Sequence, residues 1–297
     1  MSLLETAALV ALVRRGDHTW SHCADLVEST GSALAVLRGD IPQEGAEPLT
    51  LFESEPPDDE PDLAAIAGEI EIWEQQGMRL LTVLDDGYPT NLRSVHDRPP
   101  FVFVRGELRP EDDRSIAVVG TRQATPEGIG SAGTVAGDLA EGGFTIVSGL
   151  AEGIDAAAHV AALERGRRTV AVVGTGLRRA HPLKNAALQK RIATEAAVVS
   201  QFWPEAPPTK TSFPMRNVVM SGFALGTVVI EASHTSGAKM QARFALEHGR
   251  PVFLLEPLLR HEWARKYADR PGAHVVTRAD DVIRHVERLT SLDTLLA

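Results

Sequence analysis

Three glycine-containing segments carry residue types suited to binding an anion. They read GTRQATPEG over residues 120–128, SGLAEGID over 148–155 and GTGLRRAHPLKN over 174–185. Each follows a short apolar run and precedes a helical pattern, so each places glycine amides and the free N–H groups of a helix N-terminus close together. One such turn needs glycine simply to fold, but three in succession predict a site for phosphate groups.

The spacing of these glycines does not fit the common nucleotide motifs. The first segment is not GxGxxG, the third holds Gly174 and Gly176 without a third glycine, and the chain has no GxxxxGK[ST] loop. Ser148 and Gly149 stand where a dinucleotide-binding protein carries its ribose-binding carboxylate. We therefore expect neither NAD, nor a Walker-type triphosphate, nor another cofactor.

The sequence also shows no cluster of metal ligands. The ten histidines are scattered, and His159 has no second histidine four residues further on with which to share a zinc ion. We expect no metal site and interpret His159 as a helix-face residue held by a local hydrogen bond. The single cysteine, Cys23, excludes an internal disulfide and a CxxC site, and indicates a reducing compartment.

The glycine segments are positioned by an alternation of strands and helices that begins at Arg114. This alternation predicts an α/β fold with a doubly wound, mostly parallel Rossmann-like sheet. Ligands of such sheets bind beyond the carboxyl ends of the strands, which is where the glycine segments lie. The predicted strands are 115–119, 144–148, 169–173, 197–201, 227–231, 251–255 and 274–277, and the last helix is expected over 280–289.

The amino-terminal part has a different composition. Helices are predicted over 3–14, 21–30, 32–37 and 62–76, with Ser21 and Ser32 as capping residues. We expect residues 1–40 to form a small helical domain, the proline-rich and acidic residues 41–62 to form a linker, and residues 63–297 to form an extended Rossmann-like domain.

Charge is distributed unevenly along the chain. The net charge is −10, but residues 1–110 hold 8 basic and 20 acidic residues, whereas the window 165–216 holds 10 basic residues and 2 acidic ones. This density predicts a basic face suited to a phosphate backbone, with a solvated surface lacking a ligand as the alternative. No run approaches eighteen apolar residues and the opening segment lacks the features of a signal peptide, so we expect a cytoplasmic protein without a membrane partner.

Several long blocks resemble the DNA-processing protein A family, DprA, also called Smf. LTVLDDGYPTNLRSVHDRPPFVFVRGEL precedes the sheet, IAVVGTRQAT stands for the family's GSRxxS loop, and IVSGLAEGIDAAAHVAAL is similar to SGxAxGIDxxAH. VAVVGTGLRRAHPLKNAAL and SFPMRNVVMSG are similar to the GxGxxxxYPxxN and FPxRNRxIxG stretches. The resemblance implies a protein without catalytic activity that protects single-stranded DNA and loads RecA recombinase onto it, acts as a homodimer, and begins with a sterile-alpha-motif-like domain.

The resemblance also assigns the DNA-binding residues by motif position. It implies that one phosphate is held by Gly120, Thr121 and Arg122 above a floor of Ser148 and Gly149, that Gly174 and Gly176 face the DNA, and that Lys184, Asn185, Arg216 and Asn217 flank it. Arg122 offers a bidentate fork and the loop amides donate neutral hydrogen bonds, so the DNA backbone would be recognised rather than its sequence. Phe213 or Phe202 is a candidate for stacking a base, with a core position as the alternative.

The chain departs from the family pattern at several positions. Met215 and Val218 replace two arginines of the FPRRNR stretch, which predicts weaker DNA binding with a shallower salt dependence. His181 replaces the tyrosine before Pro182. Twenty residues follow Thr277, enough for one helix, so we do not expect the carboxyl-terminal winged helix that many relatives carry.

A second interpretation is a nucleotide-ligand sensor or a phosphoribohydrolase of the LOG type, a class in the same fold group that carries a PGGxGTxxE motif. The stretch GFALGTVVIE is similar, but Phe223 and Ala224 interrupt its glycine pair. Glu231 stands four residues after Thr227, which turns its side chain to the other face of an extended strand. We expect Glu231 to orient neighbouring amides or Arg122 instead.

Overall fold

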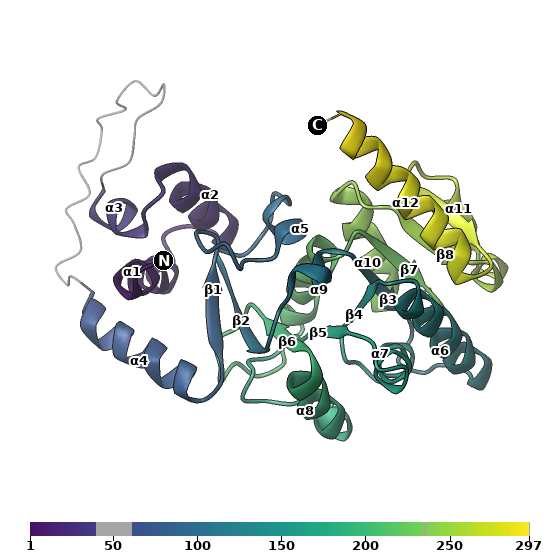
Figure 1. Ribbon diagram of the computed structural model, residues 1–297, viewed down its shortest axis with the longest axis horizontal. Coiled ribbons are helices and arrows are strands. Elements are labelled where there is room, and N and C mark those ends of the chain that lie inside the picture. Colours follow the sequence, from purple (N-terminus) through teal and green to yellow (C-terminus); the bar gives the residue numbers. More distant parts are fainter. Residues whose placement is uncertain (40–60, 235, 297) are drawn as a thin grey trace. The chain divides into compact units, whose positions relative to one another are not determined.

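The computed structural model describes residues 1–39, 61–234 and 236–296 (Figure 1). The chain divides into two compact units, one comprising Met1–Tyr88 with Pro99–Phe101 and the other Pro89–Arg98 with Val102–Ala297. The linker predicted over residues 41–62 lies outside the described residues except for its last two positions.

The described residues of the first unit form four helices and a strand. They are α1 (Leu3–Arg15), α2 (Trp20–Thr30), α3 (Ala33–Arg38), α4 (Leu63–Gln75) and β1 (Arg79–Thr82). All four predicted helices are confirmed to within about two residues. Side-chain caps explain the agreement: Ser2, Thr19, Ser32 and Asp62 each accept a hydrogen bond from the backbone N–H three residues on. Ser32 is a cap as predicted, but the prediction of Ser21 is wrong: Ser21 lies within the first turn of α2, and Thr19 caps that helix. The Glu5 carboxylate reaches from α1 to the start of α3, where it accepts hydrogen bonds from the amides of Ala33 and Leu34 at 2.6 and 3.1 Å.

The second unit contains a sheet in the order β2-β6-β5-β4-β3-β7-β8-β9. The strands of the described residues are β2 (Phe101–Gly106), β3 (Ser115–Val119), β4 (Thr145–Ser148), β5 (Thr169–Val172), β6 (Ala197–Ser200), β7 (Gly226–Val229), β8 (Val252–Leu255) and β9 (Ala273–Val276). Neighbouring strands run parallel except for β2, which is antiparallel to β6. The doubly wound, mostly parallel fold predicted from the sequence is confirmed.

Helices cover both faces of this sheet. On one face α6 (Pro126–Glu141), α7 (Ile154–Glu164) and α12 (Ala279–Leu296) enclose an apolar core with β3, β4, β7 and β8 (Figure 1). The other face is covered by α9 (Ser212–Phe223) and α10 (Gly237–Glu247), with α5 (Thr90–Arg93) against α9. The remaining helices of the described residues are α8 (Ala186–Glu195), α11 (Glu262–Ala268) and the 3₁₀ turns η1 (Pro110–Asp113), η2 (Leu183–Asn185) and η3 (Glu256–Arg260). The last helix is longer than the predicted 280–289.

The strand order places a topological switch at β3. From β3 the chain adds β4, β5 and β6 on one side and then returns to add β7, β8 and β9 on the other. Connections leave the two sides of such a point toward opposite faces of the sheet, which opens a crevice beyond the carboxyl ends of the strands. The segments after β3, β4 and β7 therefore meet at this edge, which we call the crest of the sheet.

Candidate nucleic-acid interface

Two adjoining cavities lie at the crest. The first crest cavity, about 390 Å³, is walled by the segments that follow β3, β4 and β7 and by α9. The second crest cavity, about 200 Å³, is walled by the segments that follow β4 and β5 and by α9. The residues that line both cavities are Arg122, Ala151, Phe213 and Arg216.

Arg122 and Phe213 form a cation–aromatic pair between the two cavities. The guanidinium carbon of Arg122 lies 4.9 Å from the centre of the Phe213 ring, and the His181 ring centre lies 5.6 Å from the same ring. Arg122 is exposed and Phe213 is half-buried. Of the two aromatic candidates, Phe213 therefore lines the cavities, whereas Phe202 is not among their lining residues.

Arg216 is a buried guanidinium at the base of both cavities. Its exposed fraction is 6 %, its Nη1 lies 3.9 Å from the Asp155 carboxylate, and its Nε has no hydrogen-bond partner among the described residues. Burial lowers the pKa of Arg216, and Asp155 opposes that shift. A Cβ atom at Gly149 would overlap the Arg216 guanidinium, so a larger residue there would force the guanidinium to move. An anion entering the cavity would meet a buried cation with unused hydrogen-bonding capacity.

The loop amides expected to bind phosphate are engaged within the protein. The Asp155 carboxylate accepts hydrogen bonds from the amides of Gly149 and Ala151 at 3.2 and 3.4 Å. The amide of Thr121 donates to the Glu231 carbonyl at 2.7 Å. The crest therefore offers side-chain cations to an anion in place of the loop amides that the glycine pattern predicts.

Glu231 braces the loop after β3. Its Oε2 accepts hydrogen bonds from the amide and the hydroxyl of Thr125, at 3.0 and 3.1 Å. The expectation that Glu231 orients neighbouring amides is confirmed.

Four predicted site residues lie beneath or beside the cavity walls. Ser148 is fully buried and donates from Oγ to the Val118 carbonyl at 2.6 Å. Asn185 donates from Nδ2 to the Leu150 carbonyl at 2.9 Å and so supports the loop after β4. The amide of Gly176 donates to the Ala206 carbonyl. A Cβ atom at position 176 would collide with backbone carbonyls of the loop that contains Ala206.

The fourth is Lys184, whose exposed side chain forms an ion pair of 2.6 Å with Glu152, a residue of the second crest cavity. The predicted residues that do line the cavities are Gly120, Thr121, Arg122, Gly149, Gly174, Phe213, Arg216 and Asn217.

The segment after β7 supplies cavity residues that the sequence analysis did not assign. Ser233, Ser236, Gly237 and Gln241 line the first crest cavity. Ser236 caps α10 by accepting a hydrogen bond from the amide of Ala238 at 3.2 Å. The available signal was a strand followed by small polar residues and a glycine, the pattern that marked the other three loops.

Part of the basic window 165–216 is neutralised by ion pairs. Arg168 donates two hydrogen bonds to the buried Asp112 carboxylate, at 2.9 and 2.7 Å. Arg191 pairs with Glu195 at 2.8 Å. The charge count of the window therefore overstates the cations available to a phosphate backbone.

His159 is a core residue. Its ring is completely buried, Nδ1 lies 2.6 Å from the Thr169 hydroxyl, and burial lowers the pKa of the imidazole to about 3. A hydrogen bond is present as predicted, but it joins α7 to β5 rather than near neighbours in the chain, and Nε2 has no hydrogen-bond partner among the described residues.

The sequence profile of the DNA recombination-mediator protein A family matches residues 79–287. The chain belongs to this family. It is 37 % identical over 216 residues to the DNA processing protein DprA of Streptococcus pneumoniae, covering 72 % of this chain and 76 % of that protein. It is 36 % identical over 217 residues to protein Smf of Escherichia coli, covering 72 % and 58 % of the two chains. The resemblance noted in the sequence motifs is confirmed.

Solved structures of family members share the fold. The crystal structure of DprA from Streptococcus pneumoniae superposes with a TM-score of 0.66 at 30 % identity, over 95 % of this chain and 93 % of that one. DprA from Helicobacter pylori, whose structure was described for its mode of single-stranded DNA binding, superposes with a TM-score of 0.63 at 24 % identity, over 71 % and 96 %. Within the described residues of the present chain, no helix has the length and hydropathy needed to cross a bilayer.

Proposed function

We propose that this chain binds single-stranded DNA at the two crest cavities and acts there as a mediator of recombination without catalytic activity. The observation that carries the proposal is the surface shared by the cavities, in which Arg122, Arg216 and the half-buried Phe213 ring lie together. Guanidinium groups bind phosphates and an aromatic ring stacks a base of any sequence, which is the combination used by proteins that bind single strands without sequence preference.

The paired carboxylates support a binding role over catalysis. Among the described residues lining the two cavities, the carboxylates are Asp155, which accepts hydrogen bonds from loop amides, and Glu152, which is paired with Lys184. A carboxylate that acts as a general base must be directed at a substrate. Two adjoining cavities also suit a linear polymer better than a single nucleotide.

The recombination role rests on family membership. The family is described as DNA recombination-mediator protein A, and the Helicobacter pylori member was described for its binding of single-stranded DNA. We therefore infer that the chain protects the bound strand and loads RecA recombinase onto it, in the cytoplasm and as a homodimer. A pull-down of RecA from the same cell, with and without oligonucleotide, tests this part of the proposal.

DNA binding itself is tested by titrating labelled oligo-dT at several salt concentrations. The wild-type affinity should fall steeply with salt, and Arg122→Ala should weaken binding about tenfold or more and flatten the logarithmic salt slope by about 0.7. Arg243 provides a matched control because it is exposed and lies 4.8 Å from the ring of Phe244, outside the crest cavities. Arg243→Ala should bind like the wild type.

Other outcomes would contradict the proposal. Equal losses from both arginine variants would mean that binding is not localised at the crest. If the protein ignored oligo-dT but were thermally stabilised by a nucleoside monophosphate, or hydrolysed one, the sensor or LOG-type interpretation would replace DNA binding.

A further inference from the structure

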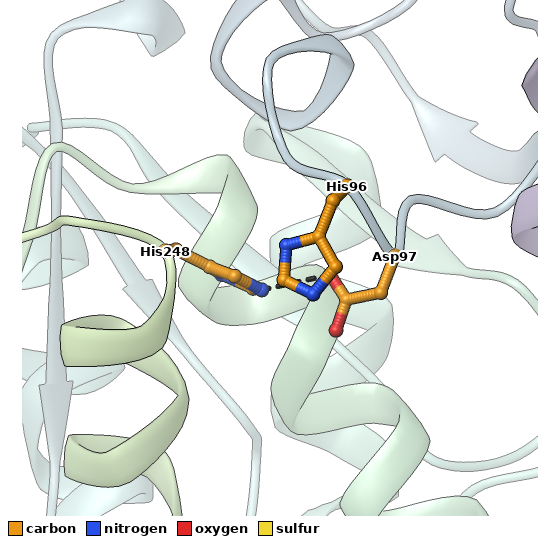
Figure 2. Close-up of side chains that lie close together, drawn as sticks. All are labelled: His96, Asp97 and His248. Atoms are coloured by element: carbon orange, nitrogen blue, oxygen red, sulfur yellow. Dashed lines mark hydrogen bonds and ion pairs between the residues drawn. The ribbon is translucent and has the colours of Figure 1, made fainter.

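Three side chains capable of ligating a metal lie together outside the crest cavities. His96 and Asp97 belong to the segment between α5 and β2, and His248 ends α10 (Figure 2). Their ligand atoms all lie within 4.8 Å of one another. Figure 2 shows the three side chains pointing toward one another from these two parts of the second unit.

We propose that His96, Asp97 and His248 form a binding site for a divalent transition-metal ion of the zinc class. Two imidazoles and one carboxylate are ligands that zinc accepts readily, whereas magnesium and calcium prefer oxygen ligands. Three protein ligands leave one coordination position for water. His96 is exposed and the Asp97 side chain is 31 % exposed, so an ion can enter from solvent.

The distances require a small rearrangement. Ligand atoms of a tetrahedral zinc site lie about 3.3 Å apart, as follows from metal–ligand bonds of about 2.0–2.2 Å. The contact of 2.7 Å between His248 Nε2 and the Asp97 carboxylate must therefore open slightly, while His96 moves inward. The exposed position of His96 permits this movement without repacking the core.

Ser221 prepares His248 for this role. The His248 ring is fully buried, and its Nδ1 lies 3.0 Å from the Ser221 hydroxyl. In the ion-bound form the imidazole is the neutral tautomer in which Nδ1–H donates to Ser221 and the lone pair of Nε2 is directed at the metal. A hydrogen bond from the second ring nitrogen is the usual support of a metal-bound histidine.

The ion would join two segments that are far apart in the sequence. His248 and Asp97 are separated by 151 positions, and Arg250 already donates to the Ser94 hydroxyl at 2.9 Å between the same segments. Bound metal would add a further connection between the end of α10 and the residues that precede β2. The site is independent of the proposed DNA binding, because none of its three residues lines a crest cavity.

The test is a titration of the 297-residue chain with Zn²⁺ against a chromophoric chelator, and with Co²⁺ followed by visible absorption. The wild type should bind one equivalent, give the absorption of tetrahedral cobalt and melt at a higher temperature with the ion. His96→Ala and Asp97→Asn should each abolish this equivalent, although the amide oxygen introduced by Asp97→Asn would still accept the hydrogen bond from His248 and preserve the fold. Ser221→Ala should lower the affinity by about tenfold to a hundredfold.

His18 provides the matched control, since it is exposed and its ring lies 4.8 Å from that of His22, outside the three-residue cluster. His18→Ala should retain the bound equivalent. The proposal is overturned if the wild type binds no equivalent, or if His96→Ala and Asp97→Asn bind Zn²⁺ and Co²⁺ as the wild type does.

Discussion

Replacing Gly149 with alanine tests the arrangement at the base of the crest cavities. An added Cβ atom would overlap the Arg216 guanidinium, which is buried and lies 3.9 Å from the Asp155 carboxylate. The chain must move the guanidinium toward the cavity and weaken its interaction with a fully buried carboxylate. Overpacking of a buried position costs about 1–3 kcal/mol, and separation from Asp155 keeps the cost at the upper end of this range.

The assay is urea denaturation followed by circular dichroism. A destabilisation of about 1–3 kcal/mol lowers the urea midpoint by about 0.5–1.5 M for a denaturant slope of about 2 kcal/mol/M. Oligo-dT binding should weaken in the same variant, because the displaced Arg216 occupies the space proposed for phosphate. Gly130 in α6 supplies the control, since a Cβ atom there has no neighbour within 4 Å.

Gly130→Ala should leave the midpoint unchanged or raise it, because alanine is favoured over glycine within a helix by about 0.5–1 kcal/mol. An unchanged midpoint for Gly149→Ala, measured beside this control, would refute the close packing of residue 149 against the Arg216 guanidinium.

Three further perturbations address other parts of the molecule. His159 has a pKa of about 3 in the folded protein, against 6.5 in the unfolded chain. Its stabilising contribution is therefore present above pH 6.5 and is lost as the pH falls toward 3. Between pH 7 and pH 5, the unfolding free energy of the wild type should fall by about 2 kcal/mol more than that of His159→Gln in paired urea titrations. Met215→Arg places a cation on the exposed start of α9 and should steepen the salt slope of oligo-dT binding by about 0.7. An unchanged slope would mean that residue 215 does not contact the bound DNA. Arg168→Met removes the cation paired with the buried Asp112 and should destabilise the fold by about 3–5 kcal/mol in urea, with no change in the salt slope of DNA binding. A flatter slope would show that Arg168 binds phosphate despite this pairing.

The sequence by itself determined the elements of this protein and their class. Strands such as β3 and β6 and the capped helices α1 to α4 lie within about two residues of their predicted positions, because apolar periodicity and capping act over a few neighbouring residues. The glycine segments that follow the strands are local signals too, and they located the crest of the sheet. The collinear motifs indicated the family.

The tertiary structure alone decided how the polar groups at the crest are paired. The glycine pattern predicted free loop amides, but Asp155 and Glu231 accept their hydrogen bonds, and the buried Arg216 stands against Gly149. The tertiary structure also placed His96 and Asp97 beside His248, although Asp97 and His248 are 151 positions apart in the sequence. Such pairings depend on which distant segments the sheet order makes adjacent, and local periodicity carries no information about that order.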